Sequence, residues 1–298
     1  MRLRLNLLSG IAAASLLALG ACGSETERAV PADAAPSGNA ERAPSGNAAE
    51  LAHIHGLGED PRTKELFVAT HYGLFRAPRE QTRLQRAGAS RQDTMGFSVV
   101  DTGRFLGSGH PDPADGGPPA LGLIASADQG RSWKSISLAG RADFHVLRSS
   151  GRQVYGADSG SGAVMVSSDG GETWTRRKPP GDLYDLAIDP ESPRHVVAST
   201  AIGIFTSRDA GARWRRVNGD AAGLLAWTGR SGLVLVDANG AVSRSDDGGR
   251  TFAPAGGVVG STPSAFVATA DGLLAALGDG TVLCSDDGGS SWQVRARP

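Results

Sequence analysis

The sequence is poor in several features that would point to particular classes of protein. Its 298 residues carry a formal net charge of −1 with acidic and basic residues interspersed, which argues against a nucleic-acid partner. Long apolar segments with helical periodicity are few, whereas 42 glycines and frequent turn dipeptides divide the chain into short apolar runs. We therefore expect an all-β fold and no nucleic-acid partner.

Long hydrophobic runs are also scarce, and the most prominent one lies at the N-terminus. Arg2 and Arg4 precede an apolar run of about fifteen residues, which is too short to span a bilayer comfortably and is typical of a secretory signal. The run ends in the sequence LGAC at Cys22, which resembles the bacterial lipobox, where the cysteine is lipidated and becomes the mature N-terminus. The alternative is an ordinary signal-peptidase site followed by an incidental cysteine.

The lipobox resemblance implies an exported protein that is anchored to the membrane surface of the bacterial cell envelope by acyl chains on Cys22. The chain that follows consists mainly of Ala, Pro, Ser, Gly, Asn and Glu, and it contains APSGNA twice, so it cannot form a core. We expect a signal peptide at 1–21, a disordered tether at 22–50 and a folded domain at 51–298. Because Cys284 is the only other cysteine, acylation of Cys22 leaves no pair for an internal disulfide.

An internal repeat is the strongest signal in the folded domain. Five segments align without gaps, each with aspartate third, glycine fifth and an aromatic last: SADQGRSW from Ser126, SSDGGETW from Ser167, SRDAGARW from Ser207, SDDGGRTF from Ser245 and SDDGGSSW from Ser285. Successive copies are 38 to 41 residues apart, which is the length of one four-stranded propeller blade. Aspartate caps turn donors and the aromatic packs between sheets, so the segments predict hairpin turns with structural rather than catalytic aspartates.

A sixth blade is expected upstream, where the repeat has decayed. The segments HIHGLGEDP, ELFVAT and GLFRA match the three inner strands of a blade, and APREQTRL follows them with Leu84 in place of the aromatic. The sequence therefore predicts a β-propeller of six four-stranded blades, which we expect to be monomeric. The residues after Trp292 suffice to finish the outer strand of the last blade, so a strand from the N-terminus is not required.

The five repeats match the pattern S-x-D-x-G-x-T-W of the Asp-box, or BNR repeat, and the domain resembles the exported bacterial Asp-box propellers of the sialidase-like superfamily. The phrases HIHGL, THYGLF, MGF, SGHPDP and DFH are similar to those of one branch that is labelled glycosyl hydrolase or exo-alpha-sialidase by fold similarity. A fold does not establish chemistry, however. Sialidases use three arginines for the substrate carboxylate, and that triad is not evident in the innermost strands here.

Five of the six histidines fall at one end of three adjacent blades when the blades are aligned. In a propeller, the start of each innermost strand and the end of each second strand meet at the mouth of the central channel. The alignment gives one set of equivalent innermost-strand positions, His55, Met95, His145 and Asp185, with His53 two residues before His55 on the same side. It gives a second set at the ends of the second strands, His71, His110, Asp158, Asp237 and Asp279.

We interpret this cluster as a binding site for a small ligand or a transition metal. Imidazoles with one thioether favour copper, whereas imidazole with carboxylate suits zinc. The expected metal ligands are His53, His55, Met95 and His145, and the expected ligand-binding residues are His71, His110 and Asp185. The loop 110–122 can cover one side with Asp112 and Asp115. The simpler alternative is that these polar residues bind water and cap strand ends.

Two other functions stay open at this point. A glycoside hydrolase acting on surface glycans needs two suitably spaced carboxylates, which Asp158, Asp185, Asp237 and Asp279 could supply. Tyr184 and Tyr155 are the aromatic hydroxyls that could contact a sugar, although both could equally be core residues. A scaffold that assists assembly of a membrane complex fits the lipid anchor and the ring, as in the Asp-box propellers that help to build photosynthetic complexes. No residue of the sequence singles out the scaffold.

Overall fold

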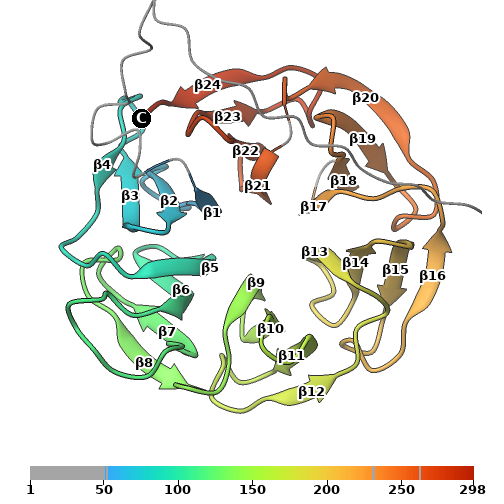
Figure 1. The fold of residues 1–298 in the computed structure, drawn as a ribbon. Helices are drawn as coiled ribbons and strands as arrows, with labels where there is room; N and C mark the ends of the chain where they lie inside the picture. The colour runs from blue at the N-terminus through green and yellow to red at the C-terminus, as the bar shows by residue number, and fades with distance from the viewer. Residues whose placement is uncertain (1–50, 52, 230–231, 262) are drawn as a thin grey trace, which may run out of the picture. The chain divides into compact units, whose positions relative to one another are not determined.

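The computed structural model describes residues 51, 53–229, 232–261 and 263–298. Within these ranges the chain is all-β, and its strands form six four-stranded antiparallel sheets. Figure 1 shows the six sheets arranged as blades around a common axis, with the first strand of each blade nearest the centre. The prediction of a six-bladed β-propeller is confirmed. The expected signal peptide, tether and lipidated Cys22 lie outside the described residues.

The first three blades run consecutively along the chain. Blade 1 contains β1 (Ile54–Glu59), β2 (Leu66–Thr70), β3 (Gly73–Ala77) and β4 (Gln85–Arg86). Blade 2 contains β5 (Asp93–Asp101), β6 (Arg104–His110), β7 (Leu123–Ser126) and β8 (Lys134–Ser137). Blade 3 contains β9 (Phe144–Ser150), β10 (Gln153–Asp158), β11 (Ala163–Ser167) and β12 (Thr175–Arg177).

The other three blades repeat the same order from the axis outward. Blade 4 contains β13 (Leu183–Ile188), β14 (Val196–Thr200), β15 (Gly203–Ser207) and β16 (Arg215–Asn218). Blade 5 contains β17 (Leu224–Thr228), β18 (Gly232–Val236), β19 (Ala241–Ser245) and β20 (Ala253–Val258). Blade 6 contains β21 (Pro263–Ala268), β22 (Leu273–Leu277), β23 (Val282–Ser285) and β24 (Gln293–Ala296). None of the described residues belongs to a helix that could cross a membrane.

Apolar side chains of adjacent blades fill the space between them, so the middle strands are apolar on both faces. Strands β2 and β14, for example, are buried along their whole length. Between blades 1 and 2, the ring centroid of Phe105 lies 4.6 Å from that of Phe67 and 5.4 Å from that of Phe97. A Cβ on Gly56 would lie only 2.7 Å from the Cβ of Phe97, so glycine is required where these two innermost strands approach each other.

The five repeated segments form the turns between the third and fourth strands of blades 2 to 6. In blade 3, Ser167 Oγ accepts the Gly171 N–H at 2.8 Å and donates to Asp169 Oδ1 at 2.7 Å. The same carboxylate accepts the N–H and hydroxyl of Thr173. Equivalent hydrogen bonds lower the pKa of the matching aspartates of the other four turns, Asp128, Asp209, Asp247 and Asp287, to about 2. These carboxylates stabilise the turns by accepting hydrogen bonds within them, and they lie away from the axis.

The C-terminus closes the ring against blade 1, where the label C lies beside β3 and β4 in Figure 1. The Arg297 N–H donates to Thr82 O at 2.7 Å, and the Leu84 N–H donates to Arg297 O at 3.1 Å. All four strands of blade 6 come from residues 263–296, as expected from the residues that follow Trp292.

Candidate functional site

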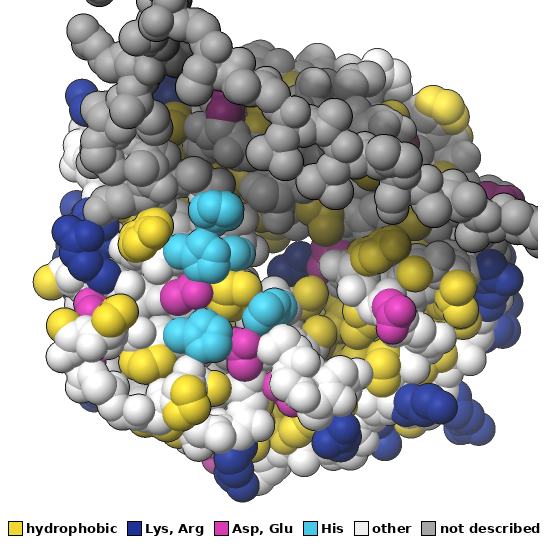
Figure 2. Space-filling model, viewed as in Figure 1, with side chains coloured by type: hydrophobic (Ala, Val, Ile, Leu, Met, Phe, Trp, Pro, Cys, Tyr) yellow, Lys and Arg dark blue, Asp and Glu magenta, His cyan; other side chains and the backbone are white. Residues whose placement is uncertain are grey.

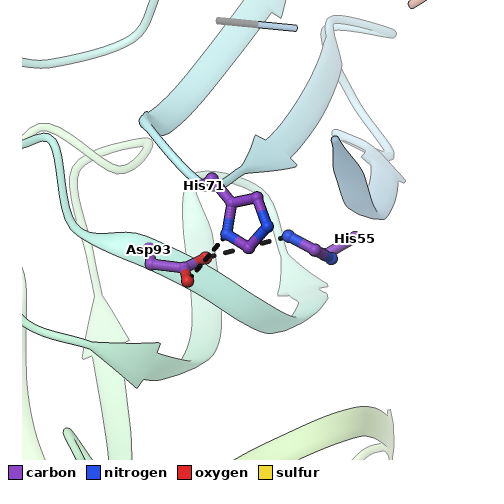
Figure 3. A group of neighbouring side chains, drawn as sticks. All are labelled: His55, His71 and Asp93. Atoms are coloured by element: carbon purple, nitrogen blue, oxygen red, sulfur yellow. Dashed lines mark ion pairs between the residues drawn. The ribbon is translucent and has the colours of Figure 1, made fainter. Parts of the chain in front are cut away.

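Two histidines and one aspartate from blades 1 and 2 face one another at one end of the axis. His55 lies near the start of β1, His71 directly follows β2, and Asp93 is the first residue of β5. Figure 3 shows the three side chains pointing toward one another. Asp93 Oδ2 lies 2.8 Å from His71 Nδ1, and Asp93 Oδ1 lies 3.8 Å from His55 Nε2. One ligand atom from each residue falls within 4.8 Å of the other two.

The spacing of these atoms suits a metal ion. Tetrahedral zinc with ligands at about 2.0–2.1 Å would hold neighbouring ligand atoms roughly 3.3 Å apart, and the two distances from Asp93 bracket that value. His55 Nε2 and Asp93 Oδ1 are both buried without a hydrogen-bond partner. Burial, followed by the nearby His71, lowers the pKa of His55 to about 4. His55 is therefore neutral near pH 7, the state in which imidazole can bind a metal.

A β-bulge explains why His55 points toward the axis. In the pairing of β1 with β2, Ile54 is opposite Thr70 and Gly56 is opposite Ala69, so His55 has no partner residue. Such an extra residue bends the strand and redirects its side chain. The same irregularity occurs at the start of the innermost strand in four more blades, at Met95, His145, Tyr184 and Ser264.

The bulges correct the sequence alignment at two positions. Tyr184, and not Asp185, is equivalent to His55, because Leu183 is opposite Thr200 and Asp185 is opposite Ser199. Asp158 is equivalent to Thr70 rather than to His71, because it is opposite Phe144, the residue before the His145 bulge. A shift of one residue moves a side chain to the other face of a strand, so neither aspartate belongs to its predicted set.

A second group of polar side chains continues the site across blades 2 and 3. His145 Nε2 lies 2.9 Å and His110 Nε2 lies 3.6 Å from Asp143 Oδ2. The Ser159 hydroxyl donates to the same oxygen at 2.7 Å, while Asp143 Oδ1 is buried without a partner. Asp93 and His110 are directly opposite each other in the β5–β6 pair, so the two groups are adjacent. Figure 2 shows histidines gathered on this face with acidic side chains between them.

Asp93 and Asp143 were missed by the sequence reasoning, although a signal for them exists. His53 lies two residues before the bulge at His55, and its ring centroid is 5.1 Å from that of His71. Asp93 and Asp143 lie two residues before the bulges of blades 2 and 3. Residues two apart in a strand point to the same side, and this rule placed His53 beside His55. The same rule applied before Met95 and His145 would have identified Asp93 and Asp143. Met95 is half-buried at the bulge of β5.

The loop 110–122 lies beside this second group. His110 Nδ1 is 2.7 Å from the carbonyl oxygen of Pro119 in the loop. Asp112 accepts the backbone N–H of Arg91 at 2.9 Å and that of Ala114 at 3.0 Å, so it fixes the loop instead of facing the histidines. Asp115 is exposed.

The two candidate catalytic carboxylates are engaged in structural hydrogen bonds. Asp185 is 1% exposed and accepts from Arg148 Nη2 at 2.7 Å, Leu186 N at 2.8 Å and Leu225 N at 2.9 Å. Burial raises the pKa of Asp185, as it would for a general acid, but these donors occupy both oxygens. Asp158 accepts the Asp143 N–H at 2.9 Å and the Ser161 hydroxyl. Tyr184 is half exposed.

The histidine pairs are separate from the main cavity between the innermost strands. That cavity, of about 290 Å³, is lined by later positions of the innermost strands of all six blades, including Phe97, Arg148 and Trp227. Arg148 is held there by Asp185, and its Nε donates to Leu186 O at 3.1 Å. The histidines therefore lie outside this cavity, whose wall combines apolar side chains with Arg148, Glu59 and Ser149.

Comparisons with known proteins agree on the fold. No family model matches the chain, and no curated protein matches it. Among solved structures it is similar to a chain of a nidogen/laminin complex, with TM-score 0.60, 15% identity and coverage of 78% of this chain and 93% of that one. A GH74 xyloglucanase from Xanthomonas campestris gives TM-score 0.56 and 17% identity over 81% of this chain. This chain covers only 45% of that enzyme's chain.

A structure of YCF48 bound to D1 peptide is also similar, with TM-score 0.52, 19% identity and coverage of 82% of each chain. That structure holds a bound peptide, whereas the xyloglucanase is an enzyme. At these identities the likeness shows a shared β-propeller fold and leaves the chemistry to the site itself.

Proposed function

We propose that this protein binds a divalent transition metal, zinc or copper, at the mouth of its channel through His55, His71 and Asp93. The observation that carries the proposal is the pair of buried, unpartnered ligand atoms, His55 Nε2 and Asp93 Oδ1, facing each other at 3.8 Å. Buried polar atoms normally have a partner, and a cation between these two would supply it.

The donor set decides which metals fit. Two imidazoles and one carboxylate suit zinc, and copper binds such a site more tightly in the Irving–Williams order. Three protein ligands leave a coordination position open for a water or a donor atom of a small ligand. His53, beside the ring of His71, is a further candidate ligand, as is the thioether of Met95 in the neighbouring bulge.

Metal binding is better supported than glycoside hydrolysis. A hydrolase needs one carboxyl group that can protonate the leaving group and a second that acts as base or nucleophile. Asp158 and Asp185 both lie in networks of backbone and side-chain donors. The xyloglucanase among the similar structures therefore supports the propeller fold and adds no catalytic pair to this chain.

The wider setting of the site is part of the proposal. On the sequence signals alone, we place the domain at the surface of the bacterial envelope, held by a lipid on Cys22 through the tether at 22–50. We also assign the chain to the sialidase-like Asp-box propellers, because the five repeats share one turn geometry. A scaffold role at the membrane is compatible with this placement, but no described residue favours it.

The test is a calorimetric and thermal titration of the metal-stripped protein with zinc and with copper. If the ion is present at about a hundred times its Kd, binding to the native state should add about 2.7 kcal/mol of stability. His55→Ala and Asp93→Asn should each abolish this gain. Asp115→Asn removes an exposed carboxylate from the same face and should leave it unchanged. If neither metal binds, or if both site variants bind as the wild type does, the proposal is wrong.

The same variants should also be assayed for hydrolysis of a set of glycosides. Glycoside turnover that survives His55→Ala but is lost in a folded Asp185→Asn variant would favour the hydrolase instead.

A further inference from the structure

We infer that the outer strands of blades 2, 3 and 4 form a surface that docks on a membrane containing anionic phospholipids. The residues concerned lie on β8, β12 and β16 or directly beside these strands, whereas the histidines lie near the axis. The inference goes beyond metal binding, because it requires neither a bound metal nor a lipid on Cys22.

Positive charge is concentrated on this part of the ring. The segments 133–137, 174–180 and 213–219 contain no acidic residue, and they carry seven basic residues: Lys134, Arg176, Arg177, Lys178, Arg213, Arg215 and Arg216. We call these seven residues the basic rim. The whole chain has a formal net charge of −1, so the remainder of it is acidic on balance. Figure 2 shows Lys and Arg side chains along the edge where Figure 1 places β12 and β16.

Most of the charge on the basic rim has no counterpart within the protein. Arg213 lies 2.9 Å from Asp209 Oδ2, and no other member forms an ion pair with a described residue. Arg176 and Arg216 donate to backbone carbonyl oxygens, which carry no net charge. All members except Arg177 are exposed. The basic rim therefore attracts negative charge from outside the molecule.

Two buried donors beside one another also lack an acceptor here. Trp174 Nε1 donates to Ser137 Oγ of the preceding blade at 2.9 Å, and Arg177 occupies the position of Ser137 one blade later. There, Arg177 Nε and Trp214 Nε1 are both buried without a partner. A Cβ on Gly211 would lie 3.7 Å from Arg177 Cγ and 3.4 Å from Trp214 Cζ2. Water can accept from both donors, but an anion would also compensate the charge.

The shape of the basic rim and one exposed apolar side chain favour a membrane over a soluble polyanion. The seven residues spread over the outer edges of three adjacent blades, so a broad surface can contact many of them at once. Ile136 lies at a β-bulge of β8 with no partner residue in β7, and it is 42% exposed. Basic side chains around an exposed apolar one suit a lipid interface, where the cations contact phosphate groups and the apolar group enters the boundary of the acyl chains.

The test uses residues 51–298, because all six blades and the buried core lie within this segment. It measures binding to vesicles of phosphatidylcholine with and without phosphatidylglycerol, in the presence of a chelator. We expect binding to the vesicles that contain phosphatidylglycerol and not to the others, and we expect it to be lost as salt rises from about 0.05 to 0.5 M. Equal binding to both kinds of vesicle, or binding to neither, would refute the inference.

Substitutions separate the basic rim from charge elsewhere. Combining Arg176→Gln, Lys178→Gln and Arg215→Gln should weaken binding at least about thirtyfold, since each cation near an anionic surface contributes about fivefold. The matched control changes three exposed arginines of blades 1 and 5 to glutamine, Arg62, Arg83 and Arg244. It has the same net charge and should bind nearly as the wild type does, because charges far from the contact are screened. Thermal melts check that both variants are folded. Equal losses in the two triple variants would overturn the docking surface.

Ile136→Ser separates a membrane from a soluble polyanion. This change should weaken binding to the anionic vesicles about threefold to fivefold and should leave binding to dextran sulfate unchanged, because only lipid offers an apolar environment. Ser135→Ala, an exposed change at the neighbouring residue, serves as the control. If Ile136→Ser has no effect on vesicle binding while the triple variant of the basic rim loses both ligands, the rim binds soluble polyanions and membrane docking is wrong.

Discussion

At the scale of single residues, the site depends on which polar atoms are left without partners. Most buried acceptors near the axis are satisfied: Asp185 binds Arg148 and two backbone amides. Among the described residues, three buried acceptors without a partner gather at the mouth, His55 Nε2, Asp93 Oδ1 and Asp143 Oδ1, and a fourth, Glu59 Oε1, belongs to a residue that lines the cavity along the axis. Such atoms reduce the stability of the empty protein and would be compensated by a bound cation. Stability and binding at this site are therefore linked through the same few atoms.

His55 should make the metal-free protein less stable in mild acid. Burial lowers the pKa of His55 to about 4 in the folded state, against the ordinary histidine value of 6.5 in the unfolded chain. Between these values the unfolded chain takes up a proton and the folded chain does not, so stability falls as pH drops from about 6.5 to 4. The free energy of unfolding of the wild type should therefore be lower at pH 4.5 than at pH 7, and we expect His55→Gln to reduce that difference by about 2 to 3 kcal/mol. Urea unfolding in the presence of a chelator, at pH 7 and at pH 4.5, measures these free energies of unfolding.

The matched control for this pH effect is His53→Gln, which changes an exposed histidine two residues away. It should leave most of the pH dependence in place. An equal loss in both variants would mean that the histidines act as a group and that burial of His55 is not the cause.

Asp185→Asn should destabilise the fold rather than disable a catalyst. The change weakens the partner of Arg148, which reaches Asp185 from blade 3, and so leaves a cation poorly compensated near the axis. Breaking a buried pair by changing one partner costs about 3 to 5 kcal/mol. Urea unfolding of Asp185→Asn tests this, and an Arg148→Met, Asp185→Asn double variant should recover part of the loss, because it removes the uncompensated cation and keeps an amide oxygen as acceptor for the backbone. If the single variant unfolds like the wild type, the pair is not structural.

At the scale of strands and turns, the sequence predicts regular features well and irregular ones poorly. The five repeats and their spacing predict the blades, because Ser, Asp, Gly and an aromatic at fixed positions form one kind of turn. The bulges at His55, Met95 and His145 fall at the predicted equivalent positions, but no turn residue marks a bulge. In blade 4 the sequence therefore aligned Asp185 where the pairing places Tyr184.

The repeated turns should contribute to stability and not to metal binding. Ser167 is 2% exposed, and its hydroxyl is the acceptor for the Gly171 N–H. Ser167→Ala would leave that buried donor unpaired, which should lower the free energy of unfolding by about 1 to 3 kcal/mol. We expect a lower midpoint in urea and unchanged zinc content. Glu172→Ala, an exposed change in the same turn, serves as the control. A loss of zinc in folded Ser167→Ala would contradict the structural role of the turn.

At the scale of the whole molecule, a closed ring holds the mouth together. His55, Asp93 and His145 come from three different blades, and their relative positions depend on how the blades pack. Large apolar side chains and small residues such as Gly56 set that packing. Neither the convergence of Asp93 on His71 nor that of Asp143 on His110 could be predicted from sequence, because both depend on distances across blades. The one place where the ring could open is the contact of blade 6 with blade 1.

Arg295 should be the main side-chain clamp at that contact. Its guanidinium donates to Gln81 O at 3.0 Å and Ala77 O at 3.0 Å, and it also reaches Lys64 O and Pro78 O, all in blade 1. Arg295→Met would leave these carbonyls without their charged donor. We expect the free energy of unfolding, measured in urea, to fall by about 2 to 3 kcal/mol. Arg295→Lys should recover little, because one ammonium group cannot span the same set of acceptors.

Arg297→Ala is the informative control, because residue 297 joins blade 1 through its backbone and not its side chain. This variant should unfold almost as the wild type does. Arg297→Pro removes the N–H that donates to Thr82 O at 2.7 Å and should lower stability. If Arg297→Ala were as damaging as Arg295→Met, closure would depend on general charge at the C-terminus. If Arg295→Met were silent, the apolar contacts of blades 1 and 6 would suffice to hold the ring closed.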